Sequence, residues 1–186
     1  MTWQERLKEL EDQKQWEDAI YYMEDIIEEH PDDMQAYLFM EYLLMNFLVE
    51  EDYDFEDQGY YASLAKKYFE EGYEKFKNNS EFLYWTGWIG VMSPWFFGID
   101  DGCYFEDMIK KAVKMDPNNV VYEWQRYLGV EEKKDSELLK EALLYCKLIL
   151  QFNSPLKAVL DKKGSMGQCM YGMMVHWANR LMKQYG

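Results

Sequence analysis

The stretch WEDAIYYMEDIIEEHP, residues 16–31, decides the fold of this chain. Its apolar residues recur with a spacing of three or four, which is typical of a helix that buries one face. Proline has no backbone N–H and clashes with the preceding turn, so Pro31 predicts the end of this helix. The residues of the apolar face are Trp16, Ala19, Ile20, Met23, Ile26 and Ile27.

The same periodicity returns in residues 105–112, 138–150 and 166–181, and no alternating run indicates a strand. Turn-forming residues interrupt the pattern at 30–33, 78–80, 93–94, 116–119, 129–135, 154–155 and 163–164. These breaks predict roughly eight or nine helices joined by short turns. The expected fold is all-α, with antiparallel helix pairs in a short α-solenoid or an irregular helical array.

The first two predicted helices have the spacing of a known repeat. The first supplies Trp3, Leu7 and Leu10, the second supplies Ala19, Met23 and Ile26, and Pro31 closes the unit. This pattern resembles the tetratricopeptide repeat, in which a small residue lets two helices approach closely. Leu7 departs from the pattern, because that family has a small residue there.

Weaker copies of the pattern follow along the chain. A second unit uses Tyr37, Leu44, Ala65, Phe69 and Gly72, with about twelve extra residues between its helices. A third unit extends from Trp85 to Pro117, and a fourth pairs 122–128 with 136–150. We therefore expect a single domain over 1–186, with helix pairs in 1–154 and capping helices in 155–186. The resemblance implies a non-enzymatic protein-binding module whose second unit presents Leu38, Tyr42 and Met45 on a concave face. The alternative is that these residues contact neighbouring helices.

The charge of the chain is concentrated at one end. The net charge is −15, and residues 1–57 contain 19 acids and 3 bases, whereas residues 58–186 contain 16 acids and 17 bases. Such an acidic end repels nucleic acid and attracts basic proteins. A basic protein partner is therefore expected, with no direct nucleic-acid contact. The alternative is a solvated helix surface that keeps the chain in solution.

An acidic insert separates the two helices of the second unit, and it is the first candidate partner-binding segment. Packed carboxylates repel one another, and a basic partner relieves that repulsion while the aromatic rings bury apolar area. Calcium is disfavoured because an EF-hand loop needs glycine where Asp57 stands and glutamate where Ser63 stands. A solvated loop is the other interpretation. The segment consists of Glu50, Glu51, Asp52, Tyr53, Asp54, Phe55, Glu56 and Asp57.

Three consecutive aromatic residues, Trp95, Phe96 and Phe97, form the second candidate partner-binding segment. They cannot all point inward from one helix face, so at least one ring is expected at the surface. The alternative is that they fill the core between two helix pairs.

Catalytic and metal-binding patterns are sparse. The chain has two histidines, His30 and His176, and three cysteines without zinc-site spacing, so we expect no catalytic site, metal or cofactor. An odd, sparse set of cysteines fits free, buried thiols in a reducing cytoplasm. The N-terminal residues lack the order of a signal peptide, and no window reaches the roughly 20 apolar residues of a membrane span.

Three functional hypotheses follow. The first is an immunity or inhibitor protein that neutralises a basic, nuclease-like toxin, since nucleases need basic surfaces to hold phosphates. The second is a tetratricopeptide-type scaffold or chaperone-like peptide-binding protein, although Glu11 and Asp12 depart from a carboxylate-binding clamp. The third is an enzyme or small-ligand sensor with an aromatic pocket formed by Trp85, Trp88, Trp95 and Trp124.

Overall fold

The structure is a computed structural model that describes residues 1–50, 55–101, 103–133, 136–151 and 154–186. Within these ranges every regular element is a helix, so the predicted all-α fold is confirmed. The chain divides into two compact units, Met1–Asp116 and Pro117–Gly186, which are described separately below. No described helix is long and apolar enough to cross a membrane.

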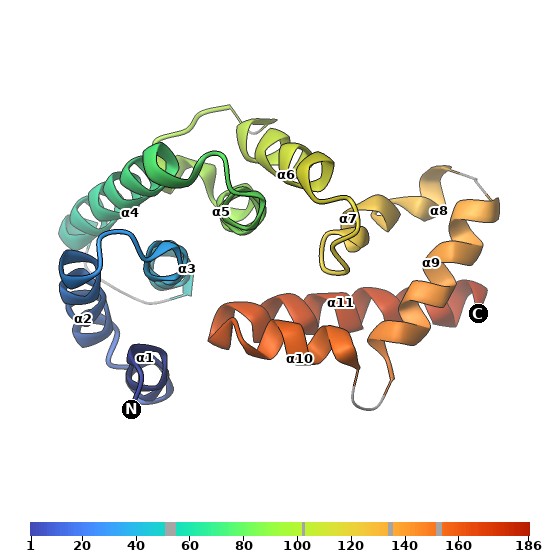
Figure 1. Cartoon of the computed structure of the whole chain (residues 1–186), viewed down its shortest axis with the longest axis horizontal. Coiled ribbons are helices and arrows are strands. Elements are labelled where there is room, and N and C mark those ends of the chain that lie inside the picture. Colours follow the sequence, from blue (N-terminus) through green and yellow to red (C-terminus); the bar gives the residue numbers. More distant parts are fainter. Residues whose placement is uncertain (51–54, 102, 134–135, 152–153) are drawn as a thin grey trace. The chain divides into compact units, whose positions relative to one another are not determined.

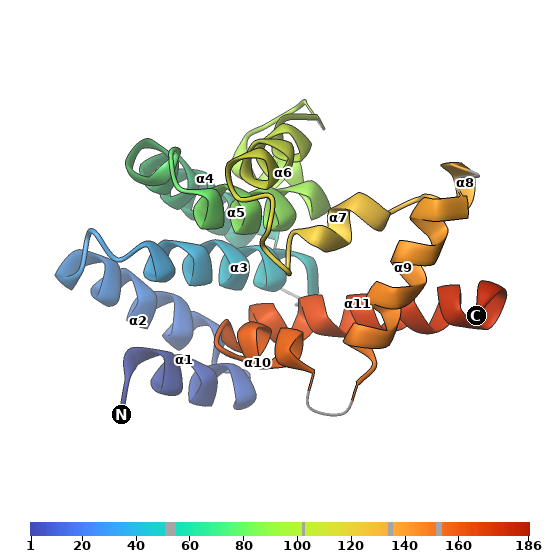
Figure 2. The same cartoon turned by 45° about the vertical axis from the view of Figure 1, so that its right-hand side comes forward.

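The first unit consists of helices that pack on their neighbours in chain order (Figures 1 and 2). Helix α1 packs on α2, α2 on α3, and α3 on both α4 and α5, while α5 and α6 share an extensive contact. The elements are α1 (Trp3–Asp12), α2 (Trp16–Glu29), α3 (Met34–Glu50), α4 (Phe55–Phe76), α5 (Ser80–Met92), the 3-10 turn η1 (Pro94–Phe97) and α6 (Cys103–Met115).

Local sequence signals set the ends of these helices. Thr2 and Glu5 form a capping box at the start of α1, in which each side chain accepts a hydrogen bond from the other residue's backbone N–H. Helix α5 begins after Asn79, whose side chain accepts hydrogen bonds from two backbone N–H groups. The turn between α1 and α2 contains Lys14 at φ 57°, a left-handed conformation that is uncommon for a non-glycine residue.

Helix α3 is the centre of the first unit, because residues 36–45 are all buried. It contacts α2, α4 and α5, which explains why its sequence is apolar on every side rather than on one face. Phe39 of α3 meets Trp3 of α1 edge to face, with ring centroids 5.3 Å apart. This aromatic pair attaches the first helix to the core of the unit.

Helices α5 and α6 approach closely because two glycines of α5 face α6. A Cβ atom placed on Gly87 would lie 2.7 Å from Ile109 Cγ1 and 2.9 Å from the backbone oxygen of Phe105. Gly90 faces the ring of Phe105 in the same way. The absence of side chains at these two positions therefore sets the distance between the two helices.

The second unit packs two short helices and α10 around α9 and α11. Its core contains the buried residues Tyr145, Cys146, Ile149, Leu156, Leu160, Met166, Met170, Met174 and Leu181. The break predicted at 154–155 lies inside this unit, since α9 contacts both α10 and α11. The elements are α7 (Glu123–Tyr127), α8 (Val130–Lys133), α9 (Ser136–Ile149), α10 (Pro155–Asp161) and α11 (Gly164–Tyr185).

Candidate functional site

The outer side of α2 carries an acidic surface of the first unit. The apolar stripe of the helix is buried, so its charged residues lie on the opposite side and are mostly exposed. In the described parts of the chain, none of these carboxylates forms an ion pair with a lysine or arginine. We call this surface the acidic face, and it consists of Glu17, Asp18, Tyr21, Glu24, Asp25, Glu28 and Tyr60 of α4.

Helix α4 anchors two carboxylates of the acidic face with tyrosine hydroxyl groups. Tyr61 donates a hydrogen bond of 3.2 Å to Glu17 Oε1, and Tyr68 donates one of 3.0 Å to Glu24 Oε1. Burial first, and then the bond to Glu24, raise the pKa of Tyr68. Tyr68 therefore remains a protonated donor at neutral pH, and each of the two carboxylates accepts a hydrogen bond from α4.

Two tyrosine rings are exposed within the acidic face. Tyr21 is 53 % exposed and Tyr60 is 47 % exposed. Partial burial, followed by the nearby groups of Glu24 and Tyr21, raises the pKa of Tyr60. Tyrosine is enriched at the energetic centres of protein interfaces because its ring buries apolar area while its hydroxyl group stays bonded. The acidic face therefore combines negative charge with apolar contact area.

A groove between α2 and α4 borders the acidic face. Its lining includes two lysines of α4, and each of them donates a hydrogen bond to a tyrosine hydroxyl group. Lys75 donates to the hydroxyl of Tyr37 at 2.8 Å, and Lys67 donates to the hydroxyl of Tyr68 at 3.2 Å. Both ammonium groups are therefore held by uncharged partners, which leaves the carboxylates of α2 without an ion-pair partner.

The structure separates the three predicted aromatic residues. Trp95 is 61 % exposed, as expected for at least one of the three rings. Phe96 and Phe97 are buried, and Phe97 packs 5.8 Å from the ring of Phe69 and 5.6 Å from that of Phe105. Phe96 and Phe97 therefore fill the core, as in the alternative interpretation. Of the three rings, only that of Trp95 is accessible to a partner.

Leu38 and Tyr42 do not present a surface in this structure. Leu38 has no exposed area, and Tyr42 is buried in a stack on Trp88 with ring centroids 6.3 Å apart. The physical reason is the central position of α3, which contacts helices on several sides. Both residues contribute to packing, which corrects their expected place on an open concave face.

The acidic insert lies partly outside the described residues. The residues that lie outside the described ranges are Glu51, Asp52, Tyr53 and Asp54. Their role in partner binding stays a prediction. Glu50 is the last residue of α3, and Phe55, Glu56 and Asp57 are in the first turn of α4.

The proposed aromatic pocket is divided between the two units. Trp85 and Trp88 are buried on α5 with ring centroids 5.8 Å apart, whereas Trp95 is exposed and Trp124 lies in the second unit. In the described ranges no group of three or more His, Cys, Asp or Glu side chains is arranged to hold a metal ion.

The cysteines differ from the expectation that all three are buried. Cys146 is buried, and burial raises the pKa of its thiol to about 11. Cys103 and Cys169 are exposed, because each lies on the outer side of an amphipathic helix. All three are free thiols.

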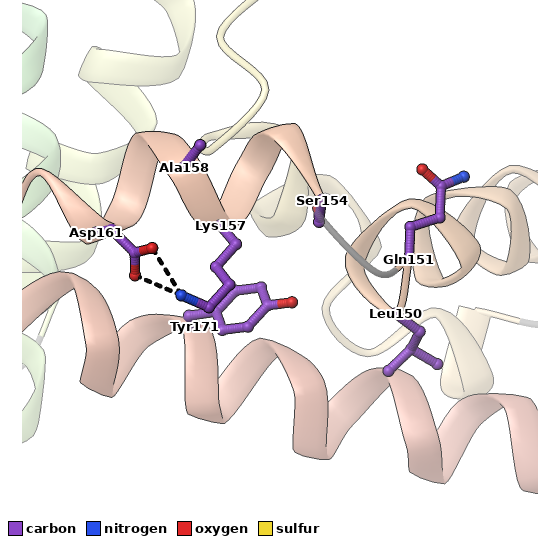
Figure 3. A pocket seen from close by; sticks show the side chains of 7 residues that line it. All are labelled: Leu150, Gln151, Ser154, Lys157, Ala158, Asp161 and Tyr171. Carbon is purple, nitrogen blue, oxygen red and sulfur yellow. Dashed lines mark hydrogen bonds and ion pairs between the residues drawn. The ribbon is translucent and has the colours of Figure 1, made fainter.

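A cavity in the second unit lies beside α10 and α11 (Figure 3). Lys157 is held by both carboxylate oxygens of Asp161, at 2.8 and 2.6 Å, and its ammonium lies 5.9 Å from the centre of the Tyr171 ring. Tyr171 in turn donates to the backbone oxygen of Ile149. The charged groups therefore neutralise one another, and the cavity has no net charge to offer a ligand.

Sequence reasoning missed a buried carboxyl group in the first unit. Glu41 of α3 is completely buried, and its Oε2 accepts a hydrogen bond of 2.7 Å from Thr86 of α5. Its Oε1 has no hydrogen-bond partner among the described residues. Burial raises the pKa of this group to about 8, and the bond from Thr86 lowers it only in part. The apolar sequence on both sides of Glu41, Leu38–Met40 and Tyr42–Met45, was the available signal.

Comparisons of the chain with protein-family models, with curated proteins and with solved structures found no match.

Proposed function

We propose that the chain is a protein-binding module whose acidic face covers a basic protein. The observation that carries this proposal is the acidic face itself, which combines carboxylates of α2 that have no ion pair among the described residues with the exposed rings of Tyr21 and Tyr60. Negative charge steers a basic partner into contact, and the tyrosines supply buried contact area once it arrives.

The class of partner that fits best is a basic, nuclease-like toxin, with this chain as its immunity or inhibitor protein. A nuclease carries a basic surface that holds phosphate groups. A surface of carboxylates with interspersed tyrosines can occupy the same basic groups and exclude the nucleic acid. A tetratricopeptide-type scaffold is the alternative, but the burial of Leu38 and Tyr42 gives it no open concave surface at those residues.

The proposal is tested with a panel of purified basic nuclease domains and a pair of matched double variants. Asp25→Asn/Glu28→Gln removes two charges from the acidic face, and Glu106→Gln/Asp107→Asn removes two from exposed positions of α6. We expect the first pair to weaken binding about tenfold or more at low salt, and the second to change it less than about threefold. Isothermal titration calorimetry at 50 and 300 mM NaCl measures both effects.

A third variant separates contact area from charge. Tyr21→Ala should weaken binding by about 1–3 kcal/mol at either salt concentration, since the ring contributes buried area rather than charge. The proposal fails if no basic nuclease binds, if affinity does not fall with salt, or if the α6 variant loses as much affinity as the α2 variant.

A further inference from the structure

A third exposed aromatic ring of the first unit lies outside the acidic face, on η1. Among the aromatic side chains whose exposure the structure describes, Trp95 is the most exposed, at 61 %. The two residues that follow it, Phe96 and Phe97, are buried, and the ring of Phe97 packs against those of Phe69 and Phe105. The exposed ring therefore stands on a turn that is fixed to the core of the unit.

The backbone of η1 also holds Trp95 in place. Gly98 ends the turn at φ 71°, and its N–H donates to the backbone oxygen of Trp95 at 3.1 Å. The N–H of Ile99 donates to the backbone oxygen of Pro94 at 3.2 Å, which completes a Schellman arrangement of hydrogen bonds. A side chain on such a rigid support loses little conformational entropy when a partner covers it.

The charged residues beside η1 are mainly acidic. Asp100 and Asp101 follow the turn, are exposed, and form no ion pair in the described parts of the chain. One base approaches the turn, since a Cβ placed on Gly98 would lie 2.9 Å from Cδ of Lys66. The ammonium of Lys66 pairs with Glu70 at 3.8 Å, so it does not compensate the two aspartates.

Helix α4 lies between Trp95 and the acidic face. On one side of α4, Tyr61 and Tyr68 donate hydrogen bonds to carboxylates of α2. On another side, Phe69 packs 5.8 Å from the ring of Phe97 in η1. Helical spacing places the exposed side of α4 between these two contacts.

The size of a stable protein interface favours a contact that reaches beyond α2. Standard interfaces bury about 800 Å² on each partner. Helix α2 has 14 residues and is therefore about 21 Å long, so one side of it has a projected area of about 200 Å². Even twice that area is about half of what a standard interface needs, and extension across α4 brings the contact to Trp95.

An exposed indole on an acidic surface is suited to a guanidinium group. Tryptophan attracts cations over its ring more strongly than tyrosine or phenylalanine, and arginine is the usual cation in such pairs. Arginine also forms paired hydrogen bonds with carboxylates such as those of Asp100 and Asp101. We propose that an arginine side chain of the basic partner stacks on Trp95, an inference that rests on the proposed function and extends its contact surface across α4.

The test uses two fluorescein-labelled peptides of equal charge on the full chain. They are Gly-Arg-Gly-Arg-Gly-Arg-Gly-Arg-Gly and the same peptide with lysine in place of arginine. Fluorescence anisotropy at about 20 mM NaCl gives both Kd values, and the Kd of the lysine peptide divided by that of the arginine peptide measures the preference for arginine. Trp95→Ser should lower this ratio about two- to fivefold, which is the contribution of one exposed cation–π contact.

Two further variants show whether the effect belongs to the indole ring. Trp95→Phe keeps an aromatic ring that attracts cations less strongly, so it should retain part of the preference for arginine. Leu144→Ser is the matched control, because Leu144 is 65 % exposed on α9 of the second unit and its loss should leave the ratio unchanged. Thermal unfolding of each variant at the wild-type temperature shows that folding is preserved.

The acidic-face variant Asp25→Asn/Glu28→Gln separates this proposal from the proposed function. It should weaken both peptides to the same degree and leave the ratio of their Kd values unchanged. If Trp95→Ser leaves the ratio at its wild-type value, stacking on Trp95 is wrong and the charge-driven function stands. If the acidic-face variant binds both peptides as the wild type does, the proposed function fails, and an absence of saturable binding overturns both.

Two measurements test other occupants of the Trp95 surface. The full chain should not bind phosphatidylcholine vesicles in a flotation assay, and it should sediment as a monomer in the ultracentrifuge. Vesicle binding that Trp95→Ser abolishes would assign the ring to a membrane surface. A dimer that Trp95→Ser dissociates would assign it to a second copy of the chain, and either result would overturn the proposal.

Discussion

At the scale of single residues, Glu41 couples the stability of the first unit to pH. Its ordinary pKa of 4.5 applies in the unfolded chain, and its pKa of about 8 applies in the folded protein. The folded state therefore retains a proton that the unfolded state loses between these values, and stability falls as pH rises through this window. Below pH 4.5 both states are protonated, and the effect vanishes.

Glu41→Gln removes this coupling, because glutamine resembles the protonated acid and does not titrate. Relative to the wild type, the variant should gain on the order of 3 kcal/mol of unfolding free energy between pH 5 and pH 8. Urea denaturation at several pH values measures the difference. Parallel stability curves for the two proteins would show that Glu41 does not titrate in this range.

At the scale of helices, the contact of α5 with α6 depends on Gly87. A methyl group there would lie 2.9 Å from the Phe105 backbone oxygen, which cannot move without shifting α6. Gly87→Ala should therefore destabilise the protein by about 1–3 kcal/mol, although alanine favours a helix.

Gly59→Ala is the matched control, because Gly59 lies in α4 and its side-chain space is empty. This change should stabilise the protein by about 0.5–1 kcal/mol through helix propensity alone. Thermal unfolding followed by circular dichroism compares the two variants. If both substitutions changed the stability in the same direction, the distance between α5 and α6 would not be limited by Gly87.

Helix positions were predictable from the sequence because their signals are local. The break at 30–33 and the proline of Ser154-Pro155 coincide with the end of α2 and the start of α10. Ser80 was the plausible N-cap in the break at 78–80, but it is the first residue of α5, and Asn79 is the N-cap.

The candidate site was predictable only in part, because it depends on contacts between distant residues. The charge of residues 1–57 indicated an acidic surface, and the Trp95 segment indicated an exposed ring. The hydrogen bonds from Tyr61 to Glu17 and from Tyr68 to Glu24 required the position of α4 beside α2, which no local pattern contains.

At the scale of the whole molecule, the two compact units differ sharply in charge. The unit Met1–Asp116 contains 28 acids and 10 bases, whereas the unit Pro117–Gly186 contains 7 acids and 10 bases. The contacts of α1 to α6 with one another form one continuous core. A chain of residues 1–116 should therefore fold by itself into a helical protein that carries the acidic face.

Expression of residues 1–116 tests this expectation. Cooperative thermal unfolding with a strong helical circular dichroism signal is the expected result, together with retained affinity for any basic partner of the full chain. A fragment that aggregates, or that unfolds without a cooperative transition, would show that the first unit needs the second.

The exposed methionine of α11, Met173, makes the outer side of that helix sensitive to oxidants. Met173 is accessible, whereas Met166, Met170 and Met174 are completely buried and protected while the unit stays folded. Mild peroxide therefore converts Met173 to its sulfoxide before it reaches these core positions. The sulfoxide is polar and hydrogen-bonding, so the apolar character of this part of the α11 surface would be lost without damage to the core. Methionine sulfoxide reductases restore the thioether, which makes this change of surface chemistry reversible.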